Sequence, residues 1–131
     1  MKLGLVLSEN LMTLDNFRFA KQAGCTHVFA SLQKASIRTF PSHTPGGAEQ
    51  RIDFCEPNEA AWTYDGLRAM RAAINDEGLE CEAIQVFNLA HFYDVMLDGP
   101  RKAEQMEILK RIIRDMGRVG IPMMGYSFTF A

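Results

Sequence analysis

The sequence predicts an α/β protein in which four parallel strands alternate with three helices. A unit that recurs three times carries this prediction: an amphipathic helix, a glycine, and a short run that is mostly apolar. The glycines are Gly24, Gly78 and Gly120. Glycine readily enters the left-handed conformation that ends many helices, and a strand that is apolar on both faces is typical of a buried parallel sheet. A further apolar run at the start of the chain is the first strand and brings the number of predicted strands to four.

The last unit, residues 100–128, shows the pattern most clearly. Pro100 suits the first turn of a helix, where its missing N–H leaves no hydrogen bond unmade. Apolar side chains then recur every three or four residues, which predicts a helix with one buried face that ends at Gly120. Residues 121–128 follow as a mostly apolar run of strand length.

The same pattern places the earlier elements. The predicted strands are residues 2–7, 26–30 and 81–87, and the predicted helices are residues 14–23 and 64–77. Thr13 and Thr63 stand just before the two helices, where a hydroxyl oxygen accepts a hydrogen bond from a free N–H of the first turn. The order is therefore strand–helix–strand–helix–strand–helix–strand, in a single domain that spans residues 1–131.

Two long connections follow predicted strands. Residues 32–61 show little periodicity and contain several prolines and glycines, and residues 88–99 form a second connection, which carries His91. Loops of such length in a compact domain are usually functional or disordered. The connections after the helices are short, so both long loops lie at the carboxyl ends of the strands. Parallel α/β folds place their sites at that end.

Composition narrows the classes of function. The chain has 131 residues, of which 47% are hydrophobic, and this is enough for one core of ordinary size. A net charge of −2 argues against nucleic acid or an anionic membrane as the main partner, and no apolar run approaches membrane-spanning length. The three cysteines are widely spaced, which predicts neither a disulfide framework nor a metal site. We expect reduced thiols in a cytoplasmic protein.

Two architectures have this order of elements: the closed eight-stranded barrel and the open doubly wound sheet. A barrel typically needs about 250 residues, so the chain would be half of one. An open sheet that binds a dinucleotide has a glycine-rich turn after its first strand, whereas residues 8–12 contain no glycine. This excludes nucleotide binding and leaves a half barrel and an open-sheet module as alternatives.

Several stretches resemble a known family. Residues 79–87, the following loop with His91, and residues 100–128 together resemble the D-mannonate dehydratases, which belong to the xylose-isomerase-like group of TIM barrels. The resemblance is greatest over the last thirty residues of the chain. It implies that the chain is the N-terminal half of a TIM barrel, with four parallel strands and the helices on one face. The sequence departs from the family pattern at Gln85, Gly125 and Ser127, where the family has Glu, Cys and Asn.

The resemblance also implies an activity for the complete enzyme, the metal-assisted removal of water from an aldonic acid. A divalent metal, Mn or Fe, is implied as cofactor, with ligands from later strands, so we expect no metal ligand in this chain. The implied partner is a small-molecule sugar acid, and the complete enzyme is expected to be a homo-oligomer. Two alternatives stay open: a metal-dependent sugar isomerase or epimerase of the same barrel group, and a non-catalytic open-sheet α/β binding module.

His91 is the catalytic candidate. It lies just beyond the third predicted strand, where an imidazole can hydrogen-bond a sugar oxygen or move a proton. A surface histidine in a loop is the alternative interpretation. His27, by contrast, lies within a strand and is expected to be a packed core residue.

Four further residues are candidates for substrate binding: Gln85, Tyr126, Ser127 and His43. Gln85 is a polar residue in an otherwise apolar strand, and a buried amide needs hydrogen-bond partners. Strand alternation predicts that Gln85 shares its face with Ala83 and Phe87, away from the helices. Tyr126 and Ser127 lie in the closing segment that resembles the family, and His43 lies in the longer of the two loops.

Overall fold

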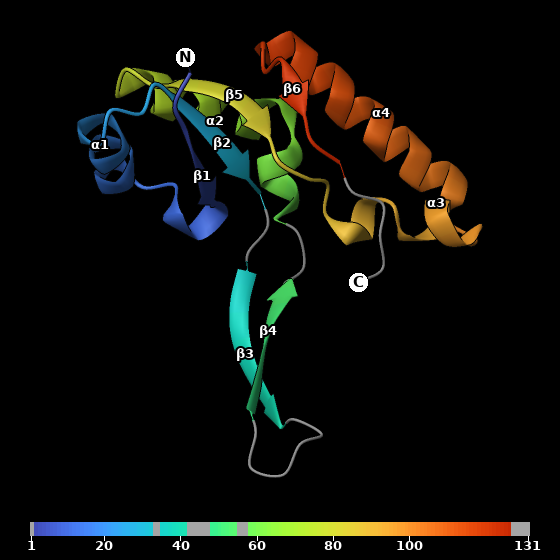
Figure 1. Ribbon diagram of the computed structural model, residues 1–131. Helices are drawn as coiled ribbons and strands as arrows, with labels where there is room; N and C mark the ends of the chain where they lie inside the picture. Colours follow the sequence, from blue (N-terminus) through green and yellow to red (C-terminus); the bar gives the residue numbers. More distant parts are fainter. Residues whose placement is uncertain (1, 33–34, 42–47, 55–57, 127–131) are drawn as a thin grey trace.

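The computed structural model describes residues 2–32, 35–41, 48–54 and 58–126 (Figure 1). Four parallel strands form the central sheet in the order β1-β2-β5-β6. These strands are β1 (Gly4–Ser8), β2 (His27–Ser31), β5 (Glu80–Ile84) and β6 (Met123–Met124). After β1, each strand of this sheet pairs with the member of the same sheet that comes before it in the chain, so the predicted parallel order is confirmed.

The helices agree closely with the periodicity of the sequence. They are α1 (Leu14–Gln22), α2 (Tyr64–Asp76), α3 (Tyr93–Leu97) and α4 (Lys102–Val119). Thr13 accepts a hydrogen bond from the backbone N–H of Asn16, and Thr63 does the same for Gly66, so both residues cap helices. Gly120 ends α4 with φ 83°, a left-handed conformation that few other residues adopt. The short helix α3 lies in a segment that was expected to be loop.

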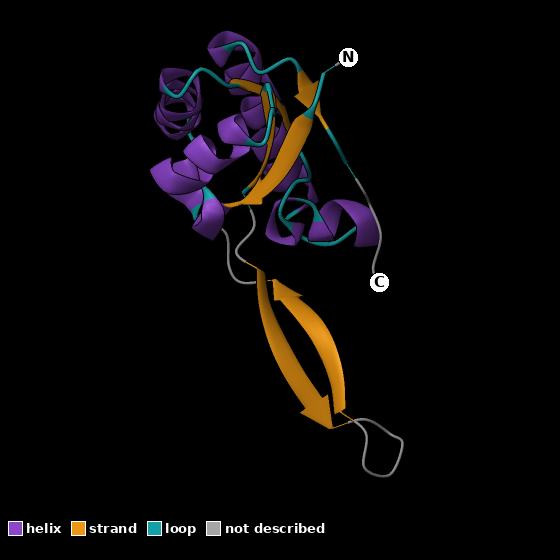
Figure 2. Ribbon diagram, turned by 60° about the vertical axis from the view of Figure 1, so that its left-hand side comes forward, coloured by secondary structure: helices purple, strands orange, loops and turns teal. Residues whose placement is uncertain are grey.

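A β-hairpin occupies much of the segment that the sequence analysis assigned to a loop, and that assignment was wrong. Strands β3 (Ala35–Pro41) and β4 (Ala48–Phe54) pair antiparallel, from Ala35 opposite Phe54 to Pro41 opposite Ala48. The hairpin leaves after β2 and projects away from the central sheet and its helices (Figures 1 and 2). Cross-strand pairing stabilises such a ribbon without the helical periodicity on which the assignment depended.

One face of the central sheet packs on the helices. From β1, β2 and β5 that face presents Leu5, Leu7, Val28, Ala30, Cys81 and Ile84. The helices contribute the other side of this core with Phe17, Ala20, Leu67, Ile74, Leu109, Ile112, Met116 and Val119. The predicted placement of the helices on one face is therefore confirmed.

The opposite face of the sheet is open within the described part of the chain. Val6 is 53% exposed and Met123 is 48% exposed, and the register places both on the side away from the helices. Between β2 and β5 the register shifts: Val28 lies opposite Cys81, but Phe29 lies opposite Ala83. The extra residue is Glu82, and this bulge changes which residues of β5 share a face.

Three short 3-10 turns complete the described structure. They are η1 (Glu9–Leu11), η2 (Glu59–Trp62) and η3 (Leu89–His91). Turn η1 follows β1, and η3 follows the segment after β5, so both lie beyond the carboxyl ends of strands. Among the described residues, no helix has the length and apolar character needed to cross a membrane.

Candidate functional site

The turns beyond the carboxyl ends of the strands contact one another. Asn58, which precedes η2, donates from Nδ2 to Glu9 Oε1 of η1 at 2.8 Å. Glu59 Oε1 lies 3.2 Å from His91 Nε2 of η3. Residues from three separate parts of the chain thus meet at the edge where parallel α/β folds place their sites.

His91 lies in this group, but its ring is buried. The residue is 2% exposed, and its ring stands edge-on to the indole of Trp62 at a centroid distance of 5.0 Å. Burial lowers the pKa of His91, and the hydrogen bond with Glu59 offsets part of that effect. Nδ1 has no hydrogen-bond partner among the described residues. The neutral ring donates from Nε2 to the Glu59 carboxylate, an arrangement that orients Glu59 at the rim.

A buried glutamine fixes the segment that carries His91. Gln105 of α4 is 3% exposed. Its Nε2 donates to the carbonyl of Ala90 at 2.9 Å, and its Oε1 accepts from the N–H groups of Asp94 and Val95 at 2.8 and 3.2 Å. These amides belong to the first turn of α3, where no helical carbonyl is available to them. The sequence analysis missed Gln105, although a polar residue beside the apolar stripe of a helix is a signal of this kind.

Gln85 and Tyr126 lie on adjacent chain segments. The backbone N–H of Gly125 donates to Ile84 at 2.9 Å, which places Gly125 beside Gln85 and Tyr126 just beyond. Gln85 is exposed, and Tyr126 is 71% exposed. Neither side chain shares the buried position of His91. Ser127 and His43, the other two candidates, lie outside the described residues.

The predicted position of Phe87 was wrong. Alternation placed Phe87 on the same face as Gln85, but strand β5 ends at Ile84, so the alternation does not extend to it. Phe87 is instead 6% exposed and stacks on Trp62, with ring centroids 6.2 Å apart. The aromatic rings of Trp62, Phe87 and His91 therefore pack together beneath the rim.

Glu9 is a further rim residue that the sequence analysis did not name. Its Oε1 accepts the hydrogen bond from Asn58, whereas its Oε2 is buried and has no hydrogen-bond partner among the described residues. Its position directly after the first strand was a signal, because that is the carboxyl end of a parallel strand.

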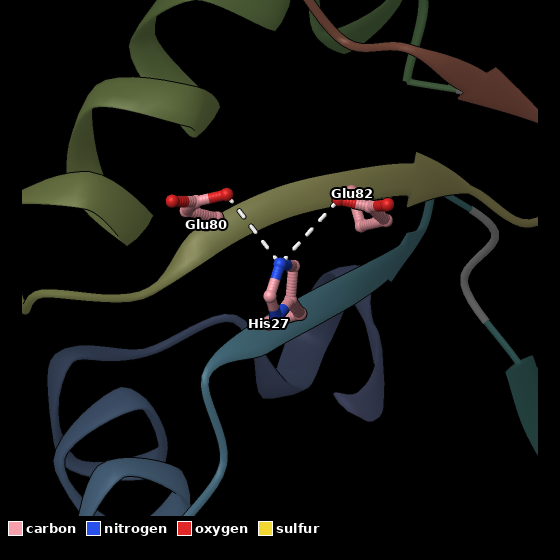
Figure 3. A group of neighbouring side chains, drawn as sticks. All are labelled: His27, Glu80 and Glu82. Carbon is pink, nitrogen blue, oxygen red and sulfur yellow. Dashed lines mark ion pairs between the residues drawn. The ribbon is translucent and has the colours of Figure 1, made fainter. Parts of the chain in front are cut away.

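A second polar cluster lies at the opposite, amino-terminal ends of the strands. His27, the first residue of β2, points toward Glu80 and Glu82 of the adjacent strand β5 (Figure 3). Its Nε2 lies 3.4 Å from Glu80 Oε2 and 3.5 Å from Glu82 Oε2. His27 is 7% exposed, so its expected burial is confirmed. The sequence analysis did not predict the two carboxylates beside His27, because they depend on the register of β2 against β5. It expected no metal ligand in this chain.

The cluster has the chemistry of a metal-binding group. One ligand atom from each of the three residues lies within 4.8 Å of the others, and imidazole with carboxylates is a donor set for divalent transition metals. Lys2 Nζ donates to Glu82 Oε1 at 2.8 Å, and this bond lowers the pKa of Glu82. A cavity of about 500 Å³ lies at the same end, with Glu80, Glu82 and Arg71 in its lining. The cluster of His27, Glu80 and Glu82 is thus remote from Gln85, which lies beyond the carboxyl end of β5.

A family model for D-mannonate dehydratase (UxuA) matches residues 46–131, more than half of the chain. The chain belongs to the D-mannonate dehydratase family. Its structure is also similar to the crystal structure of mannonate dehydratase from Streptococcus suis serotype 2, with a TM-score of 0.61 and 18% sequence identity. At that identity the likeness shows the fold alone.

The structural match covers 98% of this chain but 30% of the Streptococcus suis chain, so this chain spans less than a third of that enzyme's length. A comparison with curated proteins gave no match. The family that the sequence predicted, a family of hydro-lyases, is therefore confirmed, and the sheet of four parallel strands agrees with part of a barrel.

Proposed function

We propose that this chain forms the N-terminal part of a TIM-barrel hydro-lyase that removes water from mannonate or a closely related sugar acid. The match of the D-mannonate dehydratase model over residues 46–131 is the observation that carries the proposal. The sequential parallel order of the strands supports it, because a barrel built from βα units adds its strands in that order. The helices on one face and the open opposite face also suit a barrel wall.

The proposed reaction takes a proton and a hydroxide from adjacent carbons of an aldonic acid, releases water and leaves an enol that becomes a keto acid. A divalent metal, Mn²⁺ or Fe²⁺, would supply positive charge that lowers the proton affinity of the substrate oxygens. We infer that the amide of Gln85 and the phenol of Tyr126 would hydrogen-bond substrate hydroxyls, and their exposure near neighbouring strand ends supports this role. Ser127 and His43 remain proposed substrate contacts.

His91 remains the proposed catalytic residue, and its burial sets a condition on that role. To move a proton at the substrate, the ring would have to leave its contact with Trp62. In the described arrangement it acts through Glu59, whose side chain is 61% exposed, and so serves as a positioning residue. A pH profile distinguishes the two roles, because loss of a proton-transfer group removes a limb of the kcat profile.

Three further parts of the proposal concern the setting of the complete enzyme. We place it in the cytoplasm as a homo-oligomer whose partner is a small-molecule sugar acid. The family's metabolic chemistry supports this setting. The exposed apolar residues of the sheet support contact with further structure, since a large exposed apolar face favours association.

The test is an assay of the complete enzyme that contains this chain, loaded with Mn²⁺ or Fe²⁺ and given D-mannonate and a panel of other aldonic acids. We expect a keto acid formed with loss of one water. A product isomeric with the substrate would establish an isomerase or epimerase instead. A folded, metal-loaded protein without turnover of any sugar acid would favour a binding module.

Two variants address the residues. Gln85→Leu should raise KM about tenfold, which corresponds to one hydrogen bond of about 1.4 kcal/mol. His91→Gln should lower kcat while metal content stays unchanged. Glu104→Gln is the control, because Glu104 lies on α4 in an exposed pair with Arg101. Unchanged kinetics for Gln85→Leu would remove that residue from the site.

A further inference from the structure

We propose that His27, Glu80 and Glu82 form a binding site for a divalent first-row transition metal such as Zn²⁺, at the amino-terminal ends of β2 and β5. This proposal goes beyond the dehydratase function and does not depend on it. His27 is far in the sequence from Glu80 and Glu82, and two features of the sheet bring the three residues together: the strand register and the alternation of side chains along β5.

The register is the first feature. His27 lies directly opposite Glu80 in the parallel ladder. Alternation along β5 puts Glu82 on the face of Glu80, while Cys81 between them packs into the core. The result is two carboxylates on either side of one imidazole (Figure 3).

The distances fit a bound ion. Ligand atoms that are held about 2.1 Å from a tetrahedral metal lie about 3.4 Å apart. In the structure, Nε2 of His27 lies 3.4 Å from Glu80 Oε2 and 3.5 Å from Glu82 Oε2. All three ligand atoms lie within 4.8 Å of one another. The Glu80 side chain is 76% exposed, so it has room to move its oxygen the short distance to a vertex of the tetrahedron.

The hydrogen bonds of His27 orient a lone pair toward this position. The hydroxyl of Thr26 donates to the carbonyl of Leu3 at 3.3 Å, which uses its one proton. In the tautomer that donates from Nδ1 of His27 to that hydroxyl oxygen, 2.6 Å away, Nε2 carries the lone pair, and this is the tautomer that can bind a metal. A ring nitrogen that donates to an oxygen while the other binds metal is the usual arrangement of a histidine ligand.

His27 Nε2 is itself an unpartnered buried atom. It has no hydrogen-bond partner among the described residues, and the side chain is 9% exposed. In that tautomer the buried lone pair faces two carboxylate oxygens, which repel it unless a proton or a metal ion lies between them. This aimed and unpartnered nitrogen is an observation independent of the acidic residues, and it points to a bound cation.

The surroundings complete the site and select the ion. Lys2 neutralises one carboxylate charge from the Oε1 side of Glu82 and leaves Oε2 toward His27. The Glu80 side chain is 76% exposed, which gives an ion access from solvent, and Glu80 and Glu82 also line a cavity of about 500 Å³. A nitrogen donor favours Zn²⁺ or Fe²⁺ over Mg²⁺ and Ca²⁺, which prefer oxygen ligands alone.

The test is a calorimetric titration of the protein with Zn²⁺ at neutral pH, with Co²⁺ absorption as a report on coordination geometry. We expect one equivalent of metal to bind. Glu80→Gln should weaken binding more than about tenfold, and His27→Gln should weaken it further. Glu80 is exposed, so Glu80→Gln tests the site even where a change at buried His27 impairs folding. Lys2→Met should tighten binding, because it removes a competing positive charge.

Two controls separate the site from other ligands. Glu104→Gln removes an exposed carboxylate of the same charge on α4, and Cys81→Ser removes the thiol between the two glutamates; neither should alter the affinity for Zn²⁺. Failure to bind Zn²⁺ at millimolar concentration would overturn the proposal, and so would an unchanged affinity in folded Glu80→Gln. Neither readout uses sugar-acid turnover, so failure here and failure of the proposed dehydratase activity are distinguishable.

Discussion

Replacement of Gln105 by leucine should destabilise the rim segment that carries His91. The amide of Gln105 makes three hydrogen bonds to backbone groups, two with amides at the start of α3 and one with the carbonyl of Ala90. Leucine is close in volume and suits the apolar surroundings, so the packing loss is small. The effect therefore comes from the three backbone groups that lose their partner.

The magnitude follows from those groups. A hydrogen bond contributes about 1 kcal/mol net, and a fully buried group left unpaired loses about 1–3 kcal/mol. Asp94 and Val95 are only partly buried and Ala90 is exposed, so water replaces part of the loss. We expect a decrease in the free energy of unfolding of about 2–3 kcal/mol, well above the effect of a typical surface substitution.

Urea denaturation gives the total change, and hydrogen exchange locates it. In Gln105→Leu the amides of Asp94 and Val95 should exchange at least about tenfold faster, since 1.4 kcal/mol is a factor of ten. Amides in the middle of α2 should respond only to the global change. The variant Glu104→Gln, one position away on the exposed face, serves as the matched control. A free energy within about 0.5 kcal/mol of the parent, with unchanged exchange, would refute the reasoning.

The remaining structure yields three shorter predictions. Glutamate at both Val6 and Met123 should shift sedimentation toward monomer, because these exposed residues lie on the open face; an already monomeric parent would contradict this. Burial raises the pKa of Cys81 to about 11, so at pH 8 its thiolate is about a hundredfold scarcer than at an ordinary pKa, and iodoacetamide should label it only on unfolding. Labelling of Cys81 in the folded protein at the rate of a free thiol would contradict this prediction. Gly66→Ala should lower the free energy of unfolding by about 1–3 kcal/mol, since its Cβ would overlap the Ala60 carbonyl; an unchanged urea midpoint would show that η2 moves aside without cost.

Local signals in the sequence were sufficient for the helices and for the strand order. The second helix was predicted at residues 64–77 and observed at Tyr64–Asp76, because a threonine cap, an apolar stripe and a terminal glycine all act within a few residues of each other. The parallel order followed from the same units, since a helix between two strands forces the crossover that parallel pairing requires.

The missed features depend on contacts between distant segments. The pairing of β3 with β4 arises across a turn, and neither strand has an alternation strong enough to predict it. The cluster around His27 requires the register of β2 against β5, and one residue of slip would place Glu80 on the other face. Gln85 is exposed as predicted, whereas Phe87 is buried, because β5 ends at Ile84 and strand alternation does not govern the residues that follow it.

The burial of His91 gives a prediction with a definite sign. Its pKa in the folded protein is lowered from 6.5, chiefly by burial. The unfolded chain therefore takes up a proton first as the pH falls, so the free energy of unfolding should decrease below about pH 6.5. His91→Phe keeps an aromatic ring against Trp62 and removes the titrating group, so this part of the decrease should disappear.

Glu59→Gln supplies the opposite change. The carboxylate of Glu59 raises the pKa of His91 against the effect of burial, so its removal should lower that pKa further and make the decrease in stability with falling pH steeper. Urea titrations at several values between about pH 7.5 and 5 give the three slopes, with the parent between His91→Phe and Glu59→Gln. Three parallel curves would mean that the ring of His91 is as accessible to protons when folded as when unfolded. The ring would then be free to reach a substrate, and its described contact with Trp62 would not describe the protein in solution.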